Sequence, residues 1–291
     1  MPAPDLSIVI VTFNSSREIA ACLASLPPAL DGMASEVIVV DNASSDGTAR
    51  LVADGFPGVR LIETGANLGF SGGVNAGLRA ATGRYAAWLN PDSRVIDGRF
   101  KDVVDWLDAH PAVGIAGLKL VDEHGGVEPS SRGFPSYHSA LGHRYSLLTR
   151  IWPANPLSRR YLRTGAERTG VGQADWVSGA ALVHRRELGE QLGGLDERFF
   201  MYCEDVDFCY RAMQRQWETR YLPLVTVLHE IGASSRRVKP AMIRARHESL
   251  WKYYKKHFTR NPIKDAVTYA GIFTRCRFLL IYDALGGRRV K

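Results

Sequence analysis

The 291-residue sequence contains little cysteine and no long apolar segment. Its four cysteines form neither a CxxC pair nor the spacing of a metal site, so we expect reduced thiols rather than a disulfide scaffold or a structural zinc site. No run of 18 apolar residues occurs, which argues against a helix that crosses a membrane. The N-terminal segment also lacks the basic residues of a signal peptide. We therefore expect a cytoplasmic protein.

Acidic residues are scarce at one end of the chain. Residues 1–235 contain 22 lysines and arginines against 27 aspartates and glutamates, whereas residues 236–291 contain 15 against 3, a net charge of +12. We expect this basic segment to contact an anionic membrane surface, although a solvated helical face would carry the same charge. No recognisable nucleic-acid-binding module accompanies the charge, so a nucleic-acid partner is not expected.

Residues 266–285 are largely apolar but include Arg275, Arg277 and Asp283. This pattern predicts an amphipathic helix at the surface of a membrane, and packing of the helix on the preceding domain is the alternative. The first interpretation makes the protein peripheral on the inner face of the cell membrane. The side chains expected to enter the membrane are Phe273, Phe278, Leu279 and Ile281.

Strand and helix signals alternate along the first 120 residues. This alternation is typical of an α/β fold with a mostly parallel sheet flanked by helices. Apolar, mostly β-branched runs predict strands at 6–11, 36–40, 59–62, 85–89 and 113–118. The segments predicted to be helical lie at 15–28, 72–81 and 100–109.

The remainder of the chain divides into three parts. Residues 121–172 have scattered glycine, proline and serine, and this composition predicts an irregular insertion. A second ordered block runs from 173 to 230, before the basic segment. We therefore expect a first domain at 1–235 and a basic, amphipathic helical extension at 236–291.

Polar side chains follow several of the predicted strands. In an open parallel sheet, ligands bind beyond the carboxyl ends of the strands. An aspartate in this position, such as Asp41, can accept a hydrogen bond from the N–H group of a uracil or thymine base. Its alternative role is to cap a helix that begins near Asp46. The polar residues at the predicted strand ends are Thr12, Asn14, Asp41, Asn42, Asn90 and Asp92.

Six segments, taken together and in this order, resemble family 2 glycosyltransferases of the GT-A fold. The resemblance spans residues 6–235 and is closest to rhamnosyltransferase-like members that build bacterial surface polysaccharides. The segments are SIVIVTFN (7–14), VVDNASSDG (39–47), NLGFSGGVN (67–75), LNPDS (89–93), DWVSGA (175–180) and GLDERFFMYCEDVDFCYR (194–211).

The resemblance implies that Asp205 is the catalytic base and that Glu204 holds the acceptor. The crowding of carboxylates in the sequence 204–207 also raises their pKa values, which suits a base that works near neutral pH. An acidic first turn of a helix is the alternative. The implied donor-binding residues are Thr12, Asn14, Asp41, Asn42, Asn67, Gly69, Phe70, Asn75, Asn90 and Asp92. The implied acceptor-binding residues are Asp175, Trp176, Ser178 and Tyr202, with the insertion at 121–172 on the acceptor side.

The turn Asn90-Pro91-Asp92 differs from the commoner Asp-x-Asp turn of the family. The amide in its first position leaves one carboxylate to bind a cation. The resemblance pairs Asp92 with His229 as ligands of Mg²⁺ or Mn²⁺. Metal-independent transfer and a structural role for His229 are the alternatives.

The resemblance thus implies an inverting transfer of a sugar from a UDP- or dTDP-linked donor, with dTDP-rhamnose as the leading candidate. The expected acceptor is a saccharide or a polyprenyl-diphosphate-linked saccharide in bacterial surface polysaccharide synthesis. A nucleotidyltransferase would need a glycine-rich, basic loop after the first strand, which residues 12–15 do not provide. A catalytically silent sugar- or lipid-binding module would have no use for Glu204 and Asp205.

Overall fold

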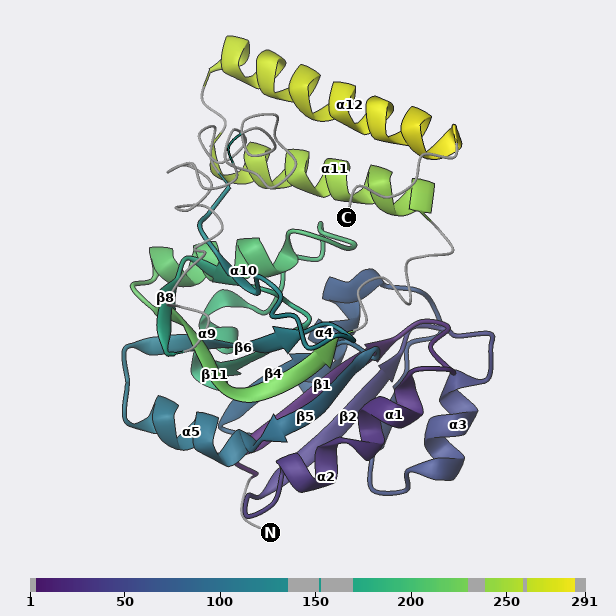
Figure 1. The fold of residues 1–291 in the computed structure, drawn as a ribbon, viewed down its shortest axis with the longest axis vertical. Coiled ribbons are helices and arrows are strands. Elements are labelled where there is room, and N and C mark those ends of the chain that lie inside the picture. The colour runs from purple at the N-terminus through teal and green to yellow at the C-terminus, as the bar shows by residue number, and fades with distance from the viewer. Residues whose placement is uncertain (1–3, 136–151, 153–169, 230–238, 259–260, 286–291) are drawn as a thin grey trace.

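A curled β-sheet forms the centre of the computed structural model, which describes residues 4–135, 152, 170–229, 239–258 and 261–285 (Figure 1). A separate two-stranded sheet pairs β7 (Ser131–Arg132) with β9 (Trp176–Val177). The strands of the main sheet are β1 (Leu6–Thr12), β2 (Ser35–Asp41), β3 (Arg60–Glu63), β4 (Tyr85–Leu89), β5 (Ser93–Gly98), β6 (Val113–Val121), β8 (Gly172–Ala174), β10 (Ala181–Arg185) and β11 (Glu218–His229).

Helices flank the sheet, and two further helices form a separate layer at the C-terminal end of the described chain (Figure 1). The helices are α1 (Ile19–Ala24), α2 (Leu26–Ala29), α3 (Thr48–Gly55), α4 (Gly69–Ala80), α5 (Phe100–Asp108), α9 (Arg186–Leu192), α10 (Glu204–Gln214), α11 (Lys239–His257) and α12 (Pro262–Ala284).

The main sheet runs in the order β3-β2-β1-β4-β10-β6-β11-β5, with β8 paired to β11. The strands β3, β2, β1 and β4 are parallel, as the alternation of strands and helices predicted. Strand β10 is antiparallel to both of its neighbours and makes the second half of the sheet mixed. The predicted α/β fold, with flanking helices and a helical C-terminal part, is confirmed.

Alternate side chains of β1 enter two different hydrophobic clusters. Leu6, Ile8 and Ile10 pack with side chains of α1, α2 and α5, whereas Val9 and Val11 pack with those of α4 and α10. A strand that is buried on both faces has no room for polar side chains within it. The polar side chains of β1 lie near its two ends, at Ser7 and Thr12, and a ligand can bind beyond the carboxyl end, at Thr12.

Two local predictions differ from the structure, and a third falls largely outside the described residues. The helix predicted at 15–28 is broken into α1 and α2, and neither Ser15 nor Ser16 caps it, because α1 begins after Glu18. Strand β5 was not predicted, since its sequence SRVIDG mixes charged and apolar residues. Of the insertion predicted at 121–172, residues 136–151 and 153–169 lie outside the described residues.

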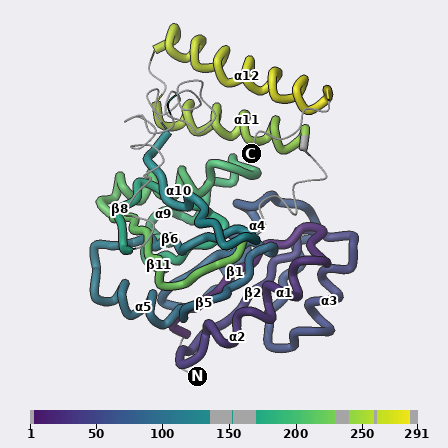
Figure 2. The backbone as a smooth tube through the Cα atoms, in the orientation of Figure 1, coloured from purple at the N-terminus to yellow at the C-terminus, as the bar shows by residue number. Residues whose placement is uncertain are grey.

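Helices α11 and α12 form an antiparallel hairpin (Figure 1). Helix α12 begins where the side chain of Asn261 accepts hydrogen bonds from the N–H groups of Ile263 and Lys264, with Pro262 in the first turn. Helix α12 packs on α11, and α11 lies between α12 and α10 (Figure 2). None of the helices in the described part of the chain has both the length and the apolar character needed to cross a bilayer.

Candidate active site

Asp205 lies in the first turn of α10, and the backbone holds its carboxylate at both oxygens. The N–H of Gly179 donates to Oδ2 (2.9 Å), and the N–H of Val206 donates to Oδ1 (2.8 Å). Burial raises the pKa of Asp205, against the opposing effects of these N–H groups and of Arg132. The carboxylate is therefore fixed in direction and more basic than an ordinary aspartate, as a general base requires.

Glu204 is more deeply buried than its neighbour. The residue is only 7% exposed, and its Oε2 has no hydrogen-bond partner among the described residues. Burial and the charge of Asp205 together raise the pKa of Glu204 well above its ordinary value. We interpret the pair as a neutral Glu204 beside an ionised Asp205, so that one group can donate a hydrogen bond while the other accepts a proton.

The two residues before α10 have strained backbone. Tyr202 and Cys203 have φ angles of +70° and +67°, in the left-handed region that side chains with a Cβ avoid. Each such residue costs about 1–3 kcal/mol, and such strain concentrates at functional sites. Neighbouring bonds hold this turn, since the N–H of Phe70 donates to the Phe200 carbonyl (2.7 Å) and the Ser249 hydroxyl donates to the Met201 carbonyl (2.8 Å).

A short segment joins Asp205 to the ends of the parallel strands. Gly179 donates to Asp205, and the carbonyl of the next residue, Ala180, accepts the N–H of Asn90 at the end of β4 (3.0 Å). A Cβ at Gly179 would lie 3.3 Å from the Cβ of Asp205 and 3.5 Å from Nε1 of Trp88. The carboxylate thus lies against the edge of the sheet where polar side chains follow the strands.

Three of these polar side chains are buried together at the ends of β1 and β2. Thr12 and Asp41 are register partners, and the Thr12 hydroxyl donates to Asp41 Oδ1 (2.9 Å). The other Asp41 oxygen accepts the N–H of Ser44 (2.9 Å), and the Asn42 amide donates to the Gly69 carbonyl (2.8 Å). Asp41 does not cap α3, because Asp46 accepts the N–H of Thr48 there (3.1 Å).

Three predicted donor-binding amides bind backbone groups of the protein. Asn14 accepts the N–H of Ser45 (2.8 Å), and Asn67 accepts that of Gly69 (2.9 Å). Asn75 is buried, donates to the carbonyl of Leu195 and accepts its N–H, both at 2.8 Å. These contacts give Asn75 a structural role between α4 and the segment before α10, and its donor contact stays a prediction.

Gly69 marks the point where α4 meets the loop before α10. Its φ angle is +74°, and a Cβ at this position would overlap the Phe200 carbonyl. Only glycine accommodates both the backbone angle and this approach. Phe70 follows it and is half-buried. The predicted donor segment 67–75 and the predicted catalytic segment 194–211 are therefore in direct contact.

Asp92 and His229 face each other, as the metal prediction requires. His229 Nε2 lies 3.7 Å from Asp92 Oδ1 and 3.5 Å from the Asn90 amide nitrogen, and His229 Nδ1 lies 3.5 Å from Glu128 Oε2. Burial lowers the pKa of His229, but Glu128 and Asp92 outweigh burial and raise it. A carboxylate oxygen and an imidazole nitrogen so close together suit a divalent cation that completes its shell with phosphate oxygens.

The protein ligands alone do not complete a metal site. Among the described residues, no group of three or more histidine, cysteine, aspartate or glutamate side chains is arranged to hold a metal ion. Glu128, which the sequence analysis missed, fits the role of a carboxylate that orients the imidazole from behind.

The predicted acceptor-binding residues differ in their exposure. Trp176 is only 8% exposed, its Nε1 donates to the Gly133 carbonyl (2.9 Å), and Arg132 covers its ring at 5.3 Å. The ring is therefore largely covered by protein, and its contact with an acceptor stays a prediction. Asp175 accepts the N–H of Phe134 (3.0 Å), while Ser178 and Tyr202 are half-buried. Phe200, at 47% exposure, is the aromatic side chain of this region that a sugar can reach.

A buried ionic cluster supports the catalytic turn, and its partners could not be predicted from the sequence. Asp207 is fully buried. Its Oδ1 lies 2.6 Å from Lys256 Nζ and 2.7 Å from His257 Nε2, both at the end of α11. Its Oδ2 lies 2.7 Å from Arg211 Nε. Burial alone raises the pKa of Asp207, but these partners outweigh it and hold the pKa below its ordinary value. The catalytic helix and the C-terminal hairpin are thus joined through one carboxylate.

Residues 7–163 match the model of Glycosyl transferase family 2. The chain belongs to glycosyl transferase family 2. This family 2 chain is 34% identical over 258 residues to N-acetylglucosaminyl-diphospho-decaprenol L-rhamnosyltransferase of Mycobacterium tuberculosis. The aligned residues cover 84% of this chain and 82% of the relative. It is also 28% identical over 231 residues to the low-salt glycan biosynthesis hexosyltransferase Agl10 of Haloferax volcanii, in an alignment that covers 77% of this chain and 67% of the relative. The predicted family and its rhamnosyltransferase-like character are confirmed.

Two solved structures illustrate the similarity in fold. The mannosyltransferase PcManGT of Pyrobaculum calidifontis, in complex with GDP-Man and Mn²⁺, has a TM-score of 0.61 and 20% identity, and covers 98% of this chain and 74% of that chain. S. aureus TarS 1–349 in complex with UDP-GlcNAc has a TM-score of 0.57 and 17% identity, and covers 93% and 72%. At these identities the likeness concerns the fold, and the GT-A fold of this family 2 chain is confirmed.

Proposed function

We propose that this family 2 enzyme transfers rhamnose from dTDP-rhamnose, with inversion, to a polyprenyl-diphosphate-linked saccharide in bacterial surface polysaccharide synthesis. The observation that carries the transferase mechanism is the basic, backbone-fixed carboxylate of Asp205 beside the ends of the parallel strands. The choice of sugar and acceptor is supported by the mycobacterial relative, whose name specifies a rhamnosyl group and a diphospho-decaprenol acceptor.

In the proposed reaction, Asp205 accepts the proton of the acceptor hydroxyl as that oxygen forms a bond to the anomeric carbon. The bond from the anomeric carbon to the diphosphate oxygen breaks on the opposite face, and the nucleoside diphosphate leaves. Neutral Glu204 donates a hydrogen bond to the acceptor. The strained turn at Tyr202 and Cys203 fixes the direction of both carboxyl groups.

Asp41 is proposed to recognise the nucleotide, because each of its carboxylate oxygens retains acceptor capacity beyond its bond to Thr12 or Ser44. Asp41→Asn keeps the size of the side chain but removes one acceptor. We expect about tenfold weaker binding of dTDP, equivalent to ~1.4 kcal/mol, measured by calorimetry on a protein with an unchanged melting temperature. Unchanged dTDP affinity would contradict the assignment.

Asp92 and His229 are the residues proposed to hold Mg²⁺ or Mn²⁺, with Glu128 orienting His229. The ion, when bound, would neutralise charge that develops on the leaving diphosphate. His229 must be neutral to act as a ligand, and its raised pKa means that protons compete at acidic pH. The affinity for Mn²⁺ is therefore expected to fall as the pH is lowered.

A lipid-linked acceptor implies a peripheral enzyme on the inner face of the cell membrane. The net charge of +12 in residues 236–291 suits the anionic headgroups of such a surface.

The test is an assay of purified enzyme with dTDP-rhamnose and a polyprenyl-diphospho-N-acetylglucosamine analogue, with UDP- and GDP-linked sugars as competing donors. We expect a rhamnosylated product whose anomeric configuration, read by NMR, is opposite to that of the donor. A product from another donor would overturn the choice of sugar. Retained configuration would overturn the mechanism. If the enzyme used none of the nucleotide sugars and acceptors tried, the whole proposal would be overturned.

A further inference from the structure

The two faces of α12 have different surroundings. Toward α11, Cys276 is buried, and Asp265 accepts hydrogen bonds from the Tyr254 hydroxyl (2.9 Å) and from Lys255 (3.0 Å). Phe273 and Leu279, which the sequence predicted to enter a membrane, are half-buried. The opposite face carries large apolar side chains that are 60% to 81% exposed. We call these the outer stripe: Ile263, Val267, Phe278, Ile281 and Leu285.

The outer stripe is straight and has two groups of large side chains, Ile263 with Val267 and Phe278 with Ile281 and Leu285, separated by the small or polar Ala270, Gly271 and Thr274. With 3.6 residues per turn, its members fall within about 60° of one another around the helix axis. From Ile263 to Leu285 the stripe is about 33 Å long. Soluble proteins rarely leave so many large apolar side chains in one exposed row, and such rows are typical of interaction surfaces.

Cations border the outer stripe, and acidic groups lie on the far side of the helix. The same helical spacing places Lys264 along one edge and Arg277 along the other, and both are exposed. The acids of α12, Asp265 and Asp283, both lie about opposite the stripe. The outer face therefore combines an apolar centre with positive edges.

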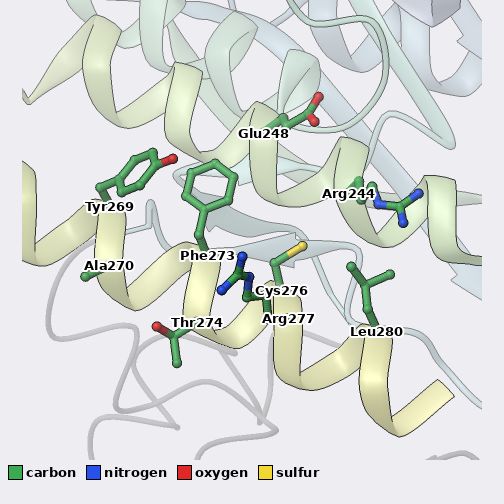
Figure 3. A pocket seen from close by; sticks show the side chains of 9 residues that line it. All are labelled: Arg244, Glu248, Tyr269, Ala270, Phe273, Thr274, Cys276, Arg277 and Leu280. Carbon is green, nitrogen blue, oxygen red and sulfur yellow. The ribbon is translucent and has the colours of Figure 1, made fainter. Parts of the chain in front are cut away.

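A groove runs beside one of these edges. It lies between α11 and α12, has a volume of about 570 Å³, and includes Arg244 and Arg277 with Phe273 and Leu280 in its lining (Figure 3). Glu248 also lines it, so its charge is mixed. The groove places two further apolar side chains, Phe273 and Leu280, beyond Arg277 on that side of the outer stripe.

We infer that the outer stripe docks α12 flat on the surface of an anionic phospholipid bilayer. The apolar side chains enter the region between headgroups and acyl chains, while Lys264 and Arg277 remain at the level of the phosphates. This inference rests on the proposed lipid-linked acceptor, and it names the surface that meets the membrane. A second copy of the chain fits less well, because two outer stripes in contact would bring like-charged edges together.

The test measures binding of the full chain to vesicles by flotation. Phosphatidylcholine vesicles with and without phosphatidylglycerol are compared at low and high salt. We expect binding to the anionic vesicles that weakens as salt is added. The double variant Phe278→Glu, Ile281→Glu should lose at least tenfold in partitioning, whereas Ile96→Glu, at an exposed isoleucine of β5, should bind as the unmodified protein does. Lys264→Gln with Arg277→Gln should reduce binding to anionic vesicles.

Two controls keep the result interpretable. The altered side chains are exposed, so thermal melting should be unchanged, and transfer to a water-soluble acceptor analogue should also be unchanged. The inference is overturned if the unmodified protein ignores anionic vesicles or if the double variant binds them equally well. A dimer in ultracentrifugation that the double variant dissociates, without vesicle binding, would assign the stripe to a second copy. Absence of transfer with intact vesicle binding would instead count against the proposed function alone.

Discussion

Helices α11 and α12 come from the same basic segment, but they make opposite kinds of contact. Side chains of α11 reach into the catalytic turn, where Ser249 binds the Met201 carbonyl and Lys256 and His257 bind the fully buried Asp207. Helix α12 contacts α11 and presents its outer stripe to solvent. The difference teaches that net charge alone does not define the role of a segment, because the same cations can anchor an active site or border an exposed surface.

The largest expected effect is at the catalytic turn that α11 supports. Asp205→Asn removes the base; its one oxygen can still accept the hydrogen bond from the N–H of Gly179, while the hydrogen bond from Val206 is lost. We expect turnover to fall by about 10²- to 10⁴-fold, the usual contribution of a general base. Initial rates and donor affinity should be measured together. Near-normal turnover would remove Asp205 from the mechanism, and lost donor binding would indicate a structural effect.

A matched pair of aspartates compares two interfaces, that of α11 with the catalytic helix α10 and that of α12 with α11. Asp207→Ala leaves Lys256, His257 and Arg211 without their buried partner, and we expect a loss of about 3–5 kcal/mol in the free energy of unfolding. Asp265→Ala removes the acid that joins α12 to α11 and should cost less, about 1–2 kcal/mol, since its ionic partner Lys255 is exposed and the Tyr254 hydroxyl loses one hydrogen bond.

Urea denaturation measures both losses. If Asp207→Ala does not fold, Asp207→Asn, which retains one hydrogen bond, provides the comparison. Equal losses at Asp207 and Asp265 would show that the two interfaces do not differ as described.

The electrostatic side of the comparison can be tested through pH. Arg132 lowers the pKa of Asp205, whereas burial raises it. Asp205 must be ionised to act, so activity is lost as the pH falls through its pKa. In Arg132→Gln the pKa rises further, and the acidic limb of the kcat/KM profile should move to higher pH. Arg50→Gln, at an exposed arginine of α3, is the control, and equal profiles for both variants would contradict the assignment.

The smallest effect is expected on α12. Ile281→Glu should change the free energy of unfolding by no more than about 0.5 kcal/mol, as for other exposed positions. Calorimetry and transfer to a water-soluble acceptor should both give values equal to those of the unmodified protein. A large loss of stability would mean that this face is covered in the folded protein.

Residues that act within one segment could be predicted from the sequence. Strand β1 reads as a buried strand because both of its faces are covered, and the acids at 204–207 stand out because they are adjacent. Arg132, Glu128 and Lys256 could not be assigned, since each meets its partner from a distant part of the chain. The burial of Trp176 could not be predicted either, because a single sequence does not indicate whether an aromatic ring is covered.

The position of α11 between α12 and the catalytic turn has a consequence for the acceptor. Helices pack with axes about 8–10 Å apart. If α12 rests on lipid, Asp205 is held above the headgroups by at least this thickness of protein. The diphosphate and sugar of a lipid-linked acceptor would then have to extend out of the headgroup layer for the hydroxyl to reach Asp205. The thickness of one helix thus sets how far a membrane-bound acceptor must rise to be modified.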